Sequence, residues 1–150
     1  MNEIQVLNDY IISEFTKNEL VNTISIVPTF NIDSNKENIY PIVNIDLQDS
    51  DIQDDVIVVS IEITVLQQRN VVKKVTNSKL LNDSNYLDNI NETHFIVAKF
   101  VNGLQRQNNI HNIEIANITP IKFLKMYGLN GLDGCQFNID LSIPIAGSAC

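Results

Sequence analysis

The chain has 150 residues, of which 44% are hydrophobic and 19% are charged, and these values are typical of a single folded domain rather than a disordered chain. Its net charge of -8 disfavours a protein that grips DNA, because such a protein gains affinity by placing Lys and Arg side chains on phosphates. The first residues include no basic segment before an apolar one, and no apolar run approaches the roughly twenty residues that span a bilayer, so we expect neither a signal peptide nor a membrane segment.

The N-terminal part of the chain predicts a helix and then a short strand. Residues 2–20 predict an amphipathic helix, because their apolar residues recur at helical spacing. These apolar residues are Ile4, Leu7, Ile11 and Phe15. The following segment, NTISIVPTF, predicts a strand at an edge or an end of a sheet, since Pro28 lacks a backbone donor.

Two segments with alternating apolar residues predict a pair of antiparallel strands. The predicted inward positions are Val43, Ile45 and Leu47 in IYPIVNIDL and Val59, Ile61, Ile63 and Val65 in VIVVSIEITVL. The segment QDSDIQDD between them predicts an exposed hairpin loop. The acidic residues of this region are Asp46, Asp49, Asp51, Asp54 and Asp55. A calcium site is disfavoured, because an EF-hand loop also needs a central glycine and a closing glutamate.

A long polar loop is predicted for residues 67–83, where the alternation stops. Its basic residues are Arg69, Lys73, Lys74 and Lys79. Its apolar residues are Val71, Val72, Leu80 and Leu81. Because no aromatic residues alternate with these cations, a solvated or protein-contacting loop is favoured over a nucleic-acid site.

The second half of the chain predicts one long helix and two strands. The helix should run from about residue 84 to residue 107 and lie across the sheet. Its predicted apolar stripe is Leu87, Ile90, His94, Val97, Val101 and Leu104. The segment IHNIEIANI predicts a strand, residues 119–134 a connection, and residues 135–143 the last strand.

The predicted order of elements is α-β-β-β-α-β-β, in one domain of residues 1–150 with a short tail at residues 145–150. This order predicts an α+β fold in which a mainly antiparallel sheet packs with two helices as a two-layer sandwich. The predicted core consists of Val43, Ile45, Ile61, Ile63, Val97, Val101, Phe137, Ile139 and Leu141.

The glycines Gly128, Gly131 and Gly134 raise the question of a phosphate-binding loop. Such a loop leads into a helix N-terminus and usually has a Lys beside it. Here the glycines lead into an alternating strand pattern, and no Lys or Ser/Thr pair follows Gly134. The sequence therefore predicts a turn.

The remaining candidates for chemistry are two histidines and two cysteines. His94 and His111 lack a partnering cysteine, so packed or capping histidines are favoured over metal ligands or acid-base groups. Cys135 and Cys150 are expected to be free thiols. No G-x-S-x-G segment or comparable nucleophile context occurs. We therefore expect no catalytic residue, no cofactor and no metal site.

Taken together, the order of these segments resembles the tail terminator or tail completion proteins of tailed bacteriophages, as found in phages of Bacteroidetes-type hosts. The resemblance spans nearly the whole chain. It rests on the segments NTISI, NIYPIVNIDL, VSIEITVLQQRN, IVAKFVNGLQ and NITPIKFLKMYGLNGLDGCQFNIDLSIP. The sequence departs from the family at Cys135 or Gln136, where members often carry Trp, and at KMY, where they carry Arg and Asp.

This resemblance implies a curved sheet flanked by helices and a structural role in the virion, as a tail terminator, a stopper or another head–tail connector. It also implies a homo-oligomeric ring, a hexamer or a dodecamer, that contacts the portal or other neck and tail proteins after assembly in the bacterial cytoplasm. DNA would pass through the ring without specific binding. The negative charge of the chain would help DNA to slide, because like charges repel.

Two loops of opposite charge, residues 46–55 and 67–83, are the predicted contacts between subunits or stacked rings. A head-to-tail interface can use this pattern, because each subunit offers one loop to each neighbour. The predicted contact residues are Asp49, Asp51, Asp54, Asp55, Arg69, Val71, Val72, Lys73, Lys74, Lys79 and Leu80. Two other classes stay open: a small-ligand enzyme of ferredoxin-like shape, and an adaptor that binds a protein partner by its sheet edge.

Overall fold

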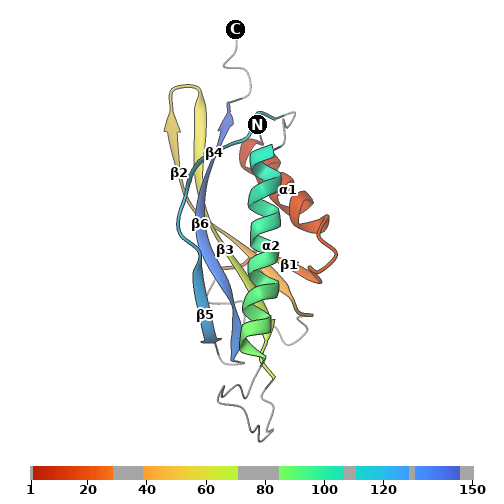
Figure 1. Ribbon diagram of the computed structural model, residues 1–150. Coiled ribbons are helices and arrows are strands. Elements are labelled where there is room, and N and C mark those ends of the chain that lie inside the picture. The colour runs from red at the N-terminus through yellow and green to blue at the C-terminus, as the bar shows by residue number, and fades with distance from the viewer. Residues whose placement is uncertain (1, 29–38, 71–84, 107–110, 129–130, 146–150) are drawn as a thin grey trace, which may run out of the picture.

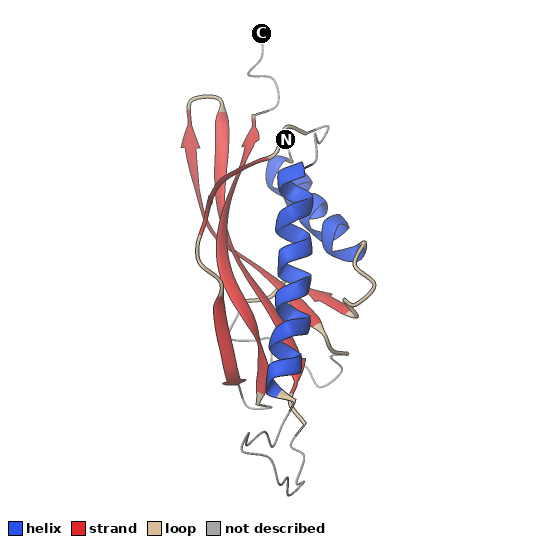
Figure 2. Ribbon diagram, in the orientation of Figure 1, coloured by secondary structure: helices blue, strands red, loops and turns tan. Residues whose placement is uncertain are grey.

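The computed structural model describes residues 2–28, 39–70, 85–106, 111–128 and 131–145. Figure 1 shows both helices on the same face of a curved sheet, and Figure 2 separates the helical layer from the strand layer. This arrangement confirms the predicted α+β fold. The helices and strands, in chain order, are α1 (Glu3–Thr16), β1 (Thr23–Ser25), β2 (Ile42–Gln53), β3 (Val56–Gln68), α2 (Tyr86–Arg106), β4 (Glu114–Ile118), β5 (Lys122–Tyr127) and β6 (Leu132–Pro144).

Over the described residues the sheet has six strands in the order β1-β2-β3-β6-β4, and β5 also pairs with β6. β1 runs parallel to β2, whereas the other pairs are antiparallel. β4 and β5 share one side of β6, because β4 pairs with residues 139–142 and β5 pairs with residues 132–136. β1 therefore lies at one edge of the sheet, as its sequence predicts, and β4 and β5 form the other edge.

The main hydrophobic core lies between the sheet and the two helices. Eight of the nine predicted core residues are buried, and the ninth, Val101, is half-buried against the same cluster. The alternation in β3 and β6 predicts the inward faces correctly, because cross-strand partners such as Ile63 and Phe137 are apolar on the same face. Phe15 of α1 stacks on Phe100 of α2 with ring centroids 4.1 Å apart, which joins the two helices above this core.

The buried face of α2 differs from the predicted stripe. Leu87 is 58% exposed and His94 is exposed, whereas Thr93, Ile96 and Phe100 are buried. The prediction missed this face because part of it is polar. The Thr93 hydroxyl donates to the Asn89 carbonyl oxygen at 2.7 Å, so a polar side chain is satisfied at a buried helix position. Likewise, α1 buries Leu7, Ile11 and Phe15 but exposes 44% of Ile4.

The predicted hairpin loop is mostly strand. β2 continues to Gln53, with Asp51 opposite Val58, and the connection to β3 is the pair Asp54 and Asp55. Asp54 adopts a φ of 50°, a left-handed conformation that Asp tolerates better than most residues. Leu47, predicted to point inward, is 37% exposed because it lies where β2 leaves the core.

Asn44, which alternates with the predicted inward positions Val43 and Ile45, is fully buried on the other face of the sheet. Its side-chain oxygen accepts from the Ser25 hydroxyl at 2.7 Å, and its side-chain nitrogen donates to the Val27 carbonyl oxygen at 2.9 Å. These bonds tie β1 and the residues after it to β2. A polar residue in the alternation therefore marks the attachment of an edge strand rather than a solvent-facing position.

The segment predicted as a connection before the last strand contains β5. The alternation was missed because Phe123 and Met126 are both more than half exposed, and because the pairing with β6 is irregular between Leu124 and Tyr127. β6 also starts earlier than predicted, at Leu132. On the face of the sheet opposite to the helices, a second small cluster contains Ile42, Leu66, Leu124 and Leu132.

The three glycines serve two different structural purposes. Gly128 and Gly131 have positive φ values of 72° and 60° in the turn between β5 and β6, as the turn prediction requires. Gly134 lies instead within β6, opposite Leu66 of β3. A Cβ atom on Gly134 would lie 1.8 Å from the Val65 carbonyl oxygen, so the close approach of these two strands requires glycine.

Replacing Gly134 with alanine is therefore expected to lower the free energy of unfolding by about 3 kcal/mol, because the clash is with backbone and the strands must separate to relieve it. Urea unfolding measures this loss. Gly103→Ala is the matched control, because its Cβ would meet only the end of the Glu14 side chain, at 3.0 Å. Equal losses in the two variants would contradict the proposed backbone clash.

Candidate functional site

The β2–β3 hairpin carries the predicted acidic residues away from the core. Figure 1 shows it extending past the ends of both helices. From Leu47 onward every residue of β2 is exposed, and Ile52 is 70% exposed. The structure therefore brings Asp49, Asp51, Asp54 and Asp55 together at the exposed end of β2 and its turn, while β3 stays paired with β6 up to Pro144. The Gln53 side-chain amide donates to the Asp51 carboxylate at 2.6 Å, which is the only hydrogen bond described for these four carboxylates.

The predicted basic loop begins later than expected, because Gln67 and Gln68 belong to β3. Arg69, predicted as a subunit contact, forms an ion pair within its own chain. Its guanidinium donates to both oxygens of the Asp133 carboxylate, at 2.7 and 2.9 Å. The two side chains are 13% and 0% exposed. Arg69 therefore holds β3 to β6, and little of it is left for a neighbour to contact.

Asp133 is the centre of a buried polar network. Besides Arg69, its carboxylate accepts from the Met126 backbone N–H at 3.1 Å and from the Asn89 side-chain amide at 3.2 Å. These contacts join β3, α2, β5 and β6. The Met126 contact satisfies a backbone donor at the irregular part of β5, where the regular pairing with β6 is interrupted.

The same end of the molecule holds the two chain segments that flank residues 71–84. The Asn70 N–H donates to the Asn85 side-chain oxygen at 2.6 Å, and the Asn85 N–H donates to the Asn70 carbonyl oxygen at 3.2 Å. Both Arg69 and Lys125 lie over the Tyr86 ring, at 5.1 and 5.4 Å from its centroid. The end of β3 and the start of α2 are therefore held at a fixed separation. The predicted contacts Val71, Val72, Lys73, Lys74, Lys79, Leu80 and Leu81 lie outside the described residues.

Beside this network, β5 presents a basic and apolar surface that the sequence analysis did not identify. Lys122 and Lys125 are exposed, Phe123 is 54% exposed and Met126 is 53% exposed. The His94 ring packs edge-on against Phe123, with centroids 6.1 Å apart. The signal in the sequence was the segment KFLKMY, in which Leu124 is buried in the small second cluster and Tyr127 packs against it.

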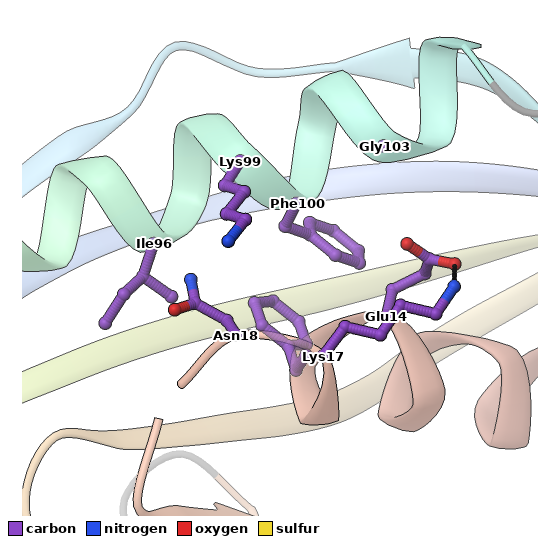
Figure 3. A pocket seen from close by; sticks show the side chains of 8 residues that line it. Glu14, Lys17, Asn18, Ile96, Lys99, Phe100 and Gly103 are labelled. Carbon is purple, nitrogen blue, oxygen red and sulfur yellow. Dashed lines mark hydrogen bonds and ion pairs between the residues drawn. The ribbon is translucent and has the colours of Figure 1, made fainter. Parts of the chain in front are cut away.

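A pocket of about 180 Å³ lies between the end of α1 and α2 (Figure 3). Lys99 of α2 reaches toward Asn18, and the Glu14 carboxylate pairs with Lys17 at 2.7 Å. The Asn18 side-chain nitrogen is buried, with no hydrogen-bond partner among the described residues. The pocket therefore offers donors for a small polar molecule, but its one carboxylate already has a partner.

Cys135 lies in the main core, with its sulfur 3.4 Å from the Thr93 hydroxyl. Burial raises the pKa of the Cys135 thiol, and the contact with Thr93 offsets part of this rise. The thiol therefore stays protonated near neutral pH, which makes it a poor nucleophile. His94 and His111 are both exposed, and the His94 ring packs against Phe123 outside the main core. Cys150 lies outside the described residues.

Within the described ranges, no three His, Cys, Asp or Glu side chains are arranged to hold a metal ion. In the same ranges, no helix has the length and apolar character needed to cross a bilayer. Comparison with known proteins finds no protein-family model that matches this chain. A search of curated proteins likewise finds no match.

Proposed function

We propose that this protein is a structural component of the neck or tail of a tailed bacteriophage, where copies of the chain form a ring around the DNA channel. The observation that carries the proposal is the exposed outer half of β2 in the β2–β3 hairpin. Seven consecutive residues of β2 are exposed, including Ile52, and they contribute nothing to the core of their own chain. An exposed edge strand of this kind is suited to contact a neighbouring subunit.

Charge distribution supports the same role. The chain carries 18 acidic and 10 basic residues, and Asp49, Asp51, Asp54 and Asp55 are concentrated on the hairpin. A surface with this balance repels a DNA backbone and leaves it free to move through a channel. The order of segments that resembles tail terminator proteins points to the neck or tail within the virion. Terminator, stopper and other connector roles share these properties.

A nonsense mutation in the gene for this chain tests the proposed function. We expect the phage to fill its heads but to release them without correctly joined or terminated tails. Electron microscopy of the lysate and mass spectrometry of purified wild-type virions give the readout. In a second variant, a Gly/Ser linker replaces residues 71–80, which hold most of the predicted basic contacts, and we expect it to prevent ring incorporation. Infectious virions of normal shape that lack the protein would refute the proposal.

A further inference from the structure

Two exposed strand edges of this fold have complementary character. The acidic edge is the outer half of β2, residues 46–53, with Asp49, Asp51 and Ile52 exposed. The basic edge is β5, with Lys122, Phe123, Lys125 and Met126 exposed. Among the described strands, β1 pairs with β2 only at residues 42–44, and β5 pairs only with β6. Both edges therefore keep one side open for a further strand.

We infer that the acidic edge of one copy of this chain lies antiparallel along the basic edge of the next copy and extends its sheet. This inference rests on the proposed function, since it names the surfaces through which the ring closes. Figure 1 places the hairpin tip and β5 toward opposite ends of the molecule. The two edges of one chain therefore do not meet each other, and the contact runs between copies, head to tail.

The direction of the strands suits this contact. β2 is antiparallel to β3, β3 to β6, and β6 to β5. β2 is therefore antiparallel to β5 within one sheet, and it stays so when a rotated copy continues that sheet. Antiparallel pairing is the more favourable arrangement for a short strand contact.

The side chains on each face also match. Asp49 and Asp51 pair with Ser60 and Val58, which places them on the face away from the helices. Lys122 pairs with Gln136 on that same face. Ile52 pairs with Ile57, and Phe123 pairs with Cys135, so both point to the face that carries the helices. In a continued sheet with Ile52 opposite Phe123 on the helix face, Asp51 would lie opposite Leu124 on the other face and diagonal to Lys122.

Electrostatics favours this pairing over its alternatives. Contact between two acidic edges or between two basic edges would bring like charges together, which disfavours a two-fold symmetric dimer. Exposed ion pairs contribute little affinity each, so Ile52, Phe123 and Met126 must supply most of the contact energy. The charges therefore select the partner and its direction, while the apolar side chains hold it.

Charge reversal tests the inference on the purified full chain by sedimentation equilibrium. We expect Asp49→Lys with Asp51→Lys, or Lys122→Glu with Lys125→Glu, to weaken self-association at least about tenfold. Combining all four substitutions should restore it to within about threefold of wild type. Lys99→Glu with Arg106→Glu on exposed positions of α2 is the matched control for the lysine pair, because it lowers the net charge by the same amount away from both edges. Far-UV circular dichroism and thermal melting confirm that each variant is folded.

NMR provides a second measurement if a lysine variant fails to fold. As the wild-type concentration rises toward the millimolar range, the amide signals of residues 49–53 and 122–126 should shift together. A chain that stays monomeric at that concentration, signals that shift elsewhere, or a fourfold variant that does not recover would overturn the inference. Rings in virions that assemble normally with either charge-reversed pair would refute this docking but keep the proposed function. Self-association through these edges by a protein that is absent from virions would support the docking but refute the proposed function.

Discussion

Replacing Ile63 with aspartate is expected to abolish folding. Ile63 is fully buried in β3, between Ile45 of β2 and Phe137 of β6. The new carboxylate would lie in an apolar core with no cation to pair with. An uncompensated buried charge costs about 4 kcal/mol or more, a large part of the about 5–15 kcal/mol that stabilises a typical domain. Soluble expression, circular dichroism and thermal melting measure the outcome.

The same substitution at Ile52 is the control. Ile52 is 70% exposed on the hairpin, so aspartate there remains hydrated and the domain should melt close to the wild-type temperature. A folded, cooperatively melting Ile63→Asp variant would show that the register of β3 is wrong. The two faces of β2 are assigned from its pairing with β3, so that assignment would be wrong as well.

Replacing Asp133 with alanine is expected to cost about 3–5 kcal/mol of unfolding free energy. The carboxylate is fully buried and accepts hydrogen bonds from Arg69, Asn89 and the Met126 N–H. Its removal would leave the Arg69 guanidinium largely buried without its ion-pair partner and the other donors unsatisfied. Urea unfolding measures the loss, and Asp51→Ala on the exposed hairpin is the control, with an expected change below about 0.5 kcal/mol.

A double variant separates the ion pair from the general loss of a buried side chain. We expect Asp133→Leu combined with Arg69→Met to be less destabilised than Asp133→Leu alone, because the second substitution removes the unpaired charge. If the two substitutions instead add independently, the Arg69–Asp133 contact carries no coupling energy, and the network does not hold this end of the sheet together.

Local patterns in the sequence determined most of the core. The alternation in β3 and β6 placed Ile61, Ile63, Phe137 and Ile139 inside, because a strand puts every second side chain on the same face regardless of what pairs with it. The two helices and the α+β class followed from the same periodicity. The acidic residues of the hairpin were also found from sequence, since their exposure follows from their charge.

The tertiary structure decided which polar residues belong inside and which apolar residues stay outside. Asn44 and Thr93 are buried because partners from other elements or their own helix satisfy them, and no local pattern reveals those partners. The Arg69–Asp133 pair joins residues 64 positions apart. Only the pairing of β3, β5 and β6 brings these two charges together, and no local pattern shows that Arg69 has a partner within its own chain. The same pairing leaves Phe123 and Met126 of β5 exposed at an open edge, which side-chain hydrophobicity alone does not predict.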